Sequence, residues 1–196
     1  MNSLAERLDK IKVIVNEDSF YNQQSLGGEL NFHIFDYEPK DELIIRKFIK
    51  TFVENNSYAN SKIRPVAFDL FEMILDILNS RKAGSNTILD LSIQKEEKEG
   101  VDKLLKAISG ILKPESFIKI IQEQIQDKNL VILYGVGKAY PIIRSHTVLN
   151  NLHAVLDNIP VIMFYPGQYD QKELNLFCGS TFEGLKDDNY YRAFRL

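Results

Sequence analysis

Leu130-Val131-Ile132-Leu133-Tyr134 is an uninterrupted apolar run that ends in a tyrosine, and Gly135 follows it directly. A strand with one wet face alternates apolar and polar residues, so an unbroken apolar run predicts a strand that is covered on both faces. Val161-Ile162-Met163-Phe164-Tyr165 has the same pattern, and Pro166-Gly167 follows it. Such strands are typical of parallel sheets between two helical layers. We predict that these two segments form the centre of a sheet of that kind.

Two shorter strands precede these runs along the chain. We predict one at Phe32-His33-Ile34-Phe35, ending at Asp36-Tyr37, and one at Pro65-Val66-Ala67-Phe68, ending at Asp69. Apolar residues at helical spacing separate the strands, in residues 44–53, 70–78 and 143–156. This alternation predicts the α/β class, with a mostly parallel sheet flanked by helices.

Further elements are expected at the ends and in the middle of the chain. Ser3 and Glu6 form an S-x-x-E capping box, which predicts that a helix begins there. In residues 85–128, the stretch with apolar residues at helical spacing is longer than a simple crossover between parallel strands needs. We therefore predict a helical insertion at about 85–128. Residues 174–178 and 190–195 are expected to form edge strands or extended cover. The whole chain, 1–196, is expected to be a single domain.

Composition narrows the class of protein. Hydrophobic residues make up 44% of the 196 residues, enough for a buried core. A lone cysteine, Cys178, excludes an internal disulfide and a zinc site built from cysteines. The net charge of −3 argues against a strongly basic nucleic-acid-binding domain. We see neither a secretory signal nor an apolar run of membrane-spanning length, and therefore expect a cytoplasmic protein that does not contact a membrane.

Candidate site residues follow from the strand ends, because ligands of open α/β sheets bind at the carboxyl ends of the strands. We expect polar groups from several loops to converge there. The candidate binding residues are Asp36, Lys138, Arg144, His146, Tyr165, Gly167 and Tyr169.

Gly135-Val136-Gly137-Lys138 is similar to part of a phosphate-binding loop. The full motif, G-x-x-x-x-G-K-[ST], needs a glycine where Ile132 stands and a hydroxyl where Ala139 stands. We therefore favour a tight strand-to-helix turn that needs glycine. The predicted fold resembles a degenerate P-loop or RecA-like core.

Two groups of charged residues have both a functional and a structural interpretation. Asp36 and Asp69 form a possible two-carboxylate metal site, but each precedes a predicted helix, where Asp commonly caps the first turn. Lys138, Arg144 and His146 form a possible anion site, but Arg144 is equally suited to pair with a strand-end aspartate. The structural interpretation is preferred for both groups.

One histidine and one tyrosine-rich segment also have structural interpretations. His33 lies inside a predicted strand and is expected to be a hydrogen-bonded core residue. Tyr165-Pro166-Gly167-Gln168-Tyr169 has two interpretations. It presents tyrosines at a strand end to a partner protein or a nucleic-acid base, or it is a type II turn whose tyrosines close the core. We expect no catalytic residue, no metal and no cofactor.

Three segments together resemble the BrxB family of bacteriophage-exclusion (BREX) defence systems. They are residues 32–43 (FHIFDYEPKDEL), 135–146 (GVGKAYPIIRSH) and 164–170 (FYPGQYD), the last followed by Leu174 and Phe177. The resemblance implies a bacterial cytoplasmic protein encoded beside a DNA methyltransferase, a large ATPase and a PglZ-type protein with an alkaline-phosphatase domain. It supplies no established catalytic residues.

Two functions from different classes follow. The leading hypothesis is a non-enzymatic component of a BREX complex that binds other BREX proteins, above all the PglZ-type protein, partly through the tyrosine-rich strand end. DNA contact is expected only within such a complex. The alternative is a phosphate- or nucleotide-binding enzyme acting on nucleotides or DNA, with Lys138, Arg144 and His146 on the phosphate and Asp36 and Asp69 on a metal.

Overall fold

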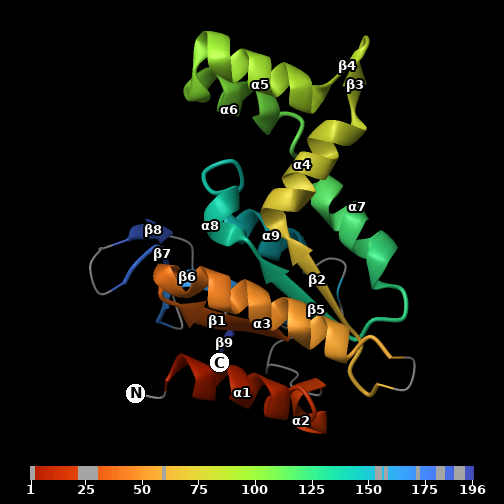
Figure 1. The fold of residues 1–196 in the computed structure, drawn as a ribbon, viewed down its shortest axis with the longest axis vertical. Coiled ribbons are helices and arrows are strands. Elements are labelled where there is room, and N and C mark those ends of the chain that lie inside the picture. Colours follow the sequence, from red (N-terminus) through yellow and green to blue (C-terminus); the bar gives the residue numbers. More distant parts are fainter. Residues whose placement is uncertain are drawn as a thin grey trace.

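A parallel sheet forms the centre of the computed structural model, with the strand order β2-β5-β6-β1-β9 (Figure 1). The structure describes residues 3–21, 31–58, 61–152, 156, 159–170, 173–179, 184–187 and 193–196. The strands of this sheet are β1 (Phe32–Tyr37), β2 (Pro65–Asp69), β5 (Leu130–Tyr134), β6 (Val161–Tyr169) and β9 (Phe194–Arg195). The mostly parallel sheet predicted from the apolar runs is confirmed.

The carboxyl half of β6 departs from the prediction. The strand continues through Pro166-Gly167 to Tyr169 and pairs there with the antiparallel strand β7 (Leu174–Leu176), which pairs with β8 (Leu185–Asp187). Gly167 lies opposite Leu176, and a Cβ added to Gly167 would lie 2.1 Å from the carbonyl oxygen of Asn175. The type II turn is therefore wrong: the glycine permits the close approach of β7.

One face of the sheet is covered by α1 (Leu4–Ile14), α2 (Asp18–Tyr21), the short 3-10 helix η1 (Pro39–Asp41) and α3 (Glu42–Asn55). The capping box is confirmed, since the Ser3 side chain accepts from the Glu6 amide and the Glu6 carboxylate accepts from the Ser3 amide. The core on this face combines residues of α1, α3 and the strands, among them Leu8, Ile11, Ile45, Ile49, Phe35 and Phe164.

The other face is covered by α4 (Leu70–Ser80), α7 (Pro114–Ile125), α8 (Val136–Ala139) and α9 (Ser145–Leu152). Their buried residues pack against the strands, among them Met73, Ile77, Phe117, Ile121, Val148, Val131 and Met163. α9 begins two residues later than predicted, and most of the residues beyond Leu152 up to 158 lie outside the described part. No helix in the described ranges is both long and apolar enough to cross a lipid bilayer.

The predicted insertion divides into two parts with different roles. The hairpin of β3 (Lys82–Ala83) and β4 (Asn86–Thr87) leads into α5 (Ile88–Glu99) and α6 (Val101–Ser109), and these elements project beyond the end of α4 (Figure 1). α7 instead returns to cover the sheet, with Phe117 and Ile121 fully buried. The projecting part is therefore shorter than the predicted 85–128.

His33 lies in the core, as predicted, with 2% of its surface exposed. Its ring stacks on Phe20, with centroids 4.5 Å apart. The Asn31 side-chain amide donates to the carbonyl of Phe20, so its oxygen accepts from His33 Nε2. Nδ1 has no partner among the described residues. Burial lowers the pKa of His33 from 6.5 to about 4, because the charged ring would lose its hydration.

This burial predicts a pH-dependent stability. The unfolded chain protonates His33 near pH 6.5, but the folded chain resists protonation down to pH 4. The contribution of neutral His33 is fully present above pH 6.5 and is lost as the pH falls towards 4. His33→Phe keeps an aromatic ring beside Phe20 but cannot be protonated. When the pH is lowered from 7 to 4.5, we expect the unfolding free energy of the wild type to fall by about 2–3 kcal/mol more than that of His33→Phe. Urea unfolding at both pH values measures this, and equal losses would contradict it.

Candidate functional site

Asp36, near the carboxyl end of β1, is the most enclosed charged group in the described part of the chain, with 2% of its surface exposed. Arg7 Nη2 lies 2.7 Å from Oδ1, and Arg195 Nη2 lies 2.7 Å from Oδ2. Arg195 Nε also donates to Oδ1 at 3.2 Å, and the amide of Tyr169 donates to Oδ2 at 3.1 Å. Both carboxylate oxygens therefore have a guanidinium partner.

The Asp36 contacts join four elements. Arg7 belongs to α1, Arg195 to β9 and Tyr169 to β6. Arg7 also donates to the carbonyl of Leu196 at 3.0 Å, and the amide of Leu196 donates to Ile34 of β1 at 3.0 Å. The prediction that Asp36 caps a helix is wrong, because its oxygens face arginines and a strand amide. The carboxylate acts as a structural anchor.

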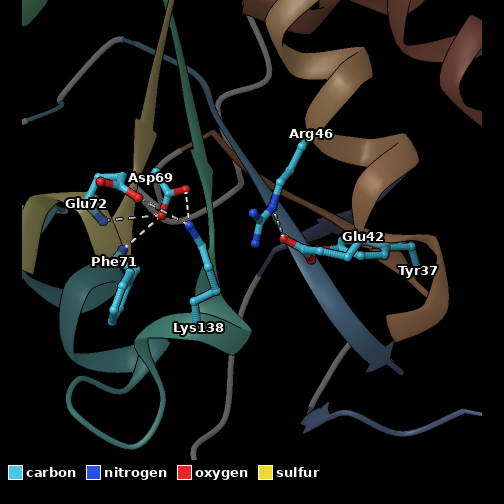
Figure 2. Close-up of polar contacts among 7 residues, drawn as sticks. All are labelled: Tyr37, Glu42, Arg46, Asp69, Phe71, Glu72 and Lys138. Carbon is cyan, nitrogen blue, oxygen red and sulfur yellow. Dashed lines mark hydrogen bonds and ion pairs between the residues drawn. The ribbon is translucent and has the colours of Figure 1, made fainter.

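Asp69, at the end of β2, caps α4 as predicted. Its Oδ1 accepts from the amides of Phe71 at 3.0 Å and Glu72 at 3.4 Å, and its Oδ2 accepts from Lys138 Nζ at 2.6 Å. Lys138 Nζ also lies 3.7 Å from Glu72 Oε1 (Figure 2). The lysine is thus held between two carboxylates from the start of one helix.

A metal shared by Asp36 and Asp69 does not fit this geometry. Two strands, β5 and β6, lie between β1 and β2. With neighbouring strands about 4.8 Å apart, the two aspartates are separated by roughly 14 Å. Within the described ranges, no group of three or more His, Cys, Asp or Glu side chains is placed to hold a metal ion.

The glycine turn after β5 is filled by protein atoms. Gly135 has φ +75°, and a Cβ added there would lie 2.2 Å from Asp69 Oδ1. A Cβ on Gly137 would lie 2.8 Å from the Phe177 ring and 3.2 Å from Pro166. The tight-turn interpretation is confirmed. Aspartate, proline and phenylalanine pack against the glycines where a phosphate loop would hold its ligand.

A third polar group lies at the same edge, beside the end of β1. The Tyr37 hydroxyl donates to Glu42, and Arg46 Nε donates to the other Glu42 oxygen at 2.7 Å (Figure 2). Burial, together with the bond to Glu42, raises the pKa of Tyr37 above its usual value. Arg46 is not among the site residues predicted from the sequence, although its spacing of four from Glu42 on a helix is a known signal for an ion pair.

The remaining candidates do not assemble into one site. Tyr165 and Tyr169 are each 1% exposed, so they form no surface for a partner or a base, and that interpretation is wrong. The Tyr169 hydroxyl bonds to both the carbonyl and the amide of Ala193. Arg144 is exposed just before α9, and the side chain of His146 lies outside the described part. The proposed anion site therefore reduces to Lys138, which is already paired.

Comparison with known proteins identifies the family. The family model for BREX protein BrxB matches residues 66–196. A BREX protein BrxB from Bacillus cereus (strain H3081.97) is 41% identical over 200 residues, covering 100% of this chain and 98% of the relative. The chain belongs to the BrxB family. A second BrxB, from Escherichia coli O9:H4 (strain HS), is 32% identical over 195 residues, covering 98% of this chain and 91% of the relative.

Membership of the BrxB family makes the chain a component of a BREX system, with a role in phage defence. The resemblance seen in the sequence is thereby confirmed. No solved structure matches the chain.

The turn after β5 yields a test of its structural role. We expect Gly135→Ala to destabilise the protein by about 2 kcal/mol or more, because the methyl group meets Asp69 and φ is positive. Gly110→Ala is the matched control, since a Cβ there meets nothing within 4 Å and φ is −71°. Thermal and urea unfolding of both variants measure the difference. Equal stabilities would contradict the packing described for this turn.

Proposed function

We propose that the chain is a non-enzymatic assembly component of a BREX complex in the bacterial cytoplasm and that it binds the PglZ-type protein. The observation that carries this proposal is the closure of the sheet edge. Asp36 is bound by two arginines, Lys138 by two carboxylates, and Glu42 by Tyr37 and Arg46. Groups paired in this way already have protein partners and are poorly suited to act as nucleophile, base or phosphate ligand.

Exposed apolar side chains support a binding role. Ile93 on α5 and Val101 on α6, the projecting helices, are each 51% exposed. In this proposal a partner protein covers these side chains. DNA contact, if the complex makes it, is assigned to the assembled complex and not to this chain alone.

The likeness to a degenerate P-loop or RecA-like core stays a prediction. It is supported by the parallel sheet and by the glycine turn directly after the buried strand β5. In this proposal the turn keeps the shape of such a core, and Phe177 and Pro166 occupy the space of the ligand.

Co-purification together with ligand screening tests the proposal. We expect the tagged chain to retain the PglZ-type protein with or without DNA. We also expect ATP or GTP with Mg²⁺ to leave the melting temperature unchanged. A ligand at about 100 times its Kd would add about 2.7 kcal/mol of stability, which a thermal scan detects.

Lys138→Ala and Lys119→Ala are the matched variants for the nucleotide arm. Lys138 lies at the glycine turn, whereas Lys119 is an exposed residue of α7. Nucleotide stabilisation that disappears in Lys138→Ala but persists in Lys119→Ala would favour the enzyme alternative instead. Failure of the PglZ-type protein to co-purify would refute the partner assignment.

A further inference from the structure

A groove of about 530 Å³ runs between α1 and α3, which lie side by side on the same face of the sheet (Figure 1). The residues that line it come from both helices and include Ile63, two residues before β2 begins. On α1 they include Leu8, Asp9 and Lys12, and on α3 they include Ile44, Lys47 and Phe48.

The groove has an apolar floor and an apolar wall. Leu8, Phe52 and Ile63 are buried at its base. Phe48 stacks on Phe52 with centroids 5.7 Å apart. Ile44, on the wall, is 54% exposed, although the helical pattern of residues 44–53 predicted a single apolar face turned to the core. The apolar surface of α3 is therefore wider than the sheet covers.

The dimensions fit a helix. The lining runs from Ile44 to Asn55 on α3 and from Ala5 to Asn16 on α1. Each span is about 16 Å at 1.5 Å per residue, or three helical turns. A groove between two helices offers ridges and holes to a third, and amphipathic helices bind such grooves through apolar residues at i, i+3, i+4 and i+7.

The rim supplies the charge. Lys12 of α1 and Lys47 of α3 are both exposed, one on each side of the groove. Among the described residues that line the groove, Asp9 is the single carboxylate, and it pairs with Lys12 at 2.7 Å in an exposed contact that contributes little. The Lys12 ammonium also lies 5.7 Å from the centre of the Phe48 ring. The described part of the lining therefore has two lysines against one carboxylate, in a chain whose net charge is −3. A partner with acidic residues beside its apolar stripe complements this rim.

We propose that the groove between α1 and α3 binds an acidic amphipathic helix of another protein of the BREX complex. This inference rests on the proposed assembly function and assigns it a surface. Apolar side chains of the bound helix contact Ile44 and fill the space over Leu8 and Phe52, and its carboxylates face Lys12 and Lys47.

Overlapping 18-residue peptides that cover the co-encoded BREX proteins test the groove, with the full chain as receptor and fluorescence polarisation as readout. We expect the peptides that bind to be acidic and amphipathic. Ile44→Asp and Lys47→Glu should each weaken their binding about tenfold or more. Leu43→Asp and Lys50→Glu are the matched controls, since both residues are exposed neighbours on α3 that do not line the groove, and they should change binding less than about twofold.

The outcomes separate this proposal from the PglZ assignment. Three results would contradict the assignment of the groove as a binding site for an acidic helix. They are that no peptide binds, that the peptides that bind are basic, or that the control variants lose as much peptide affinity as the groove variants. Light scattering that shows Ile44→Asp turning a dimer into a monomer would also contradict it, because a second copy would then be the occupant. If no peptide binds but the PglZ-type protein still co-purifies with Ile44→Asp and Lys47→Glu, the proposed function is supported and the assignment of the groove as a binding site is refuted. An acidic peptide bound from a different BREX protein supports the groove and leaves the PglZ assignment to its own test.

Discussion

A buried carboxylate that must be neutralised is the constraint on which the arrangement of this molecule depends. An unpaired charge at the position of Asp36 would cost several kcal/mol. The structure meets that cost with Arg7 from α1, Arg195 from β9 and the amide of Tyr169 from β6. Each partner is available only when its own element is in place, so one side chain couples the N-terminal helix, the edge strand and the extension of β6 to the middle of the sheet.

The same principle governs the rest of the carboxyl edge of the sheet. Lys138 and Asp69 form an ion pair. In the turn between β5 and Lys138, Gly135 packs against Asp69, and Gly137 packs against Pro166 and Phe177. In an open α/β sheet this edge is where ligands bind, but here its polar groups bind one another. In the proposed function the partner contacts lie on the outer surfaces, where α1 and α3 leave an apolar groove and the helices α5 and α6 project from the body (Figure 1).

Local patterns in the sequence predicted local structure well. Unbroken apolar runs located β5 and β6, the capping box located α1, and the position of Asp69 before an apolar helix predicted its cap. The failures involve partners far apart in the chain. Asp36 meets Arg7 and Arg195, which are 29 and 159 positions away, and no spacing rule links them. Pro166-Gly167 has the composition of a turn, but pairing with β7 makes it strand and places Tyr165 and Tyr169 in the core. The groove likewise needs two helices whose proximity no local pattern encodes.

The unfolding free energy of Asp36→Asn, measured by urea denaturation, tests most directly whether the polar sheet edge is structural. Asparagine puts an NH₂ donor where one carboxylate oxygen now accepts from arginine and the Tyr169 amide. The account predicts that the unfolding free energy falls by about 2–4 kcal/mol. The charge-assisted hydrogen bonds are lost, and N–H groups of the arginines or of Tyr169 are left facing the NH₂ group of asparagine. A variant as stable as the wild type, or more stable, would contradict it, since residues kept for catalysis commonly cost a protein stability.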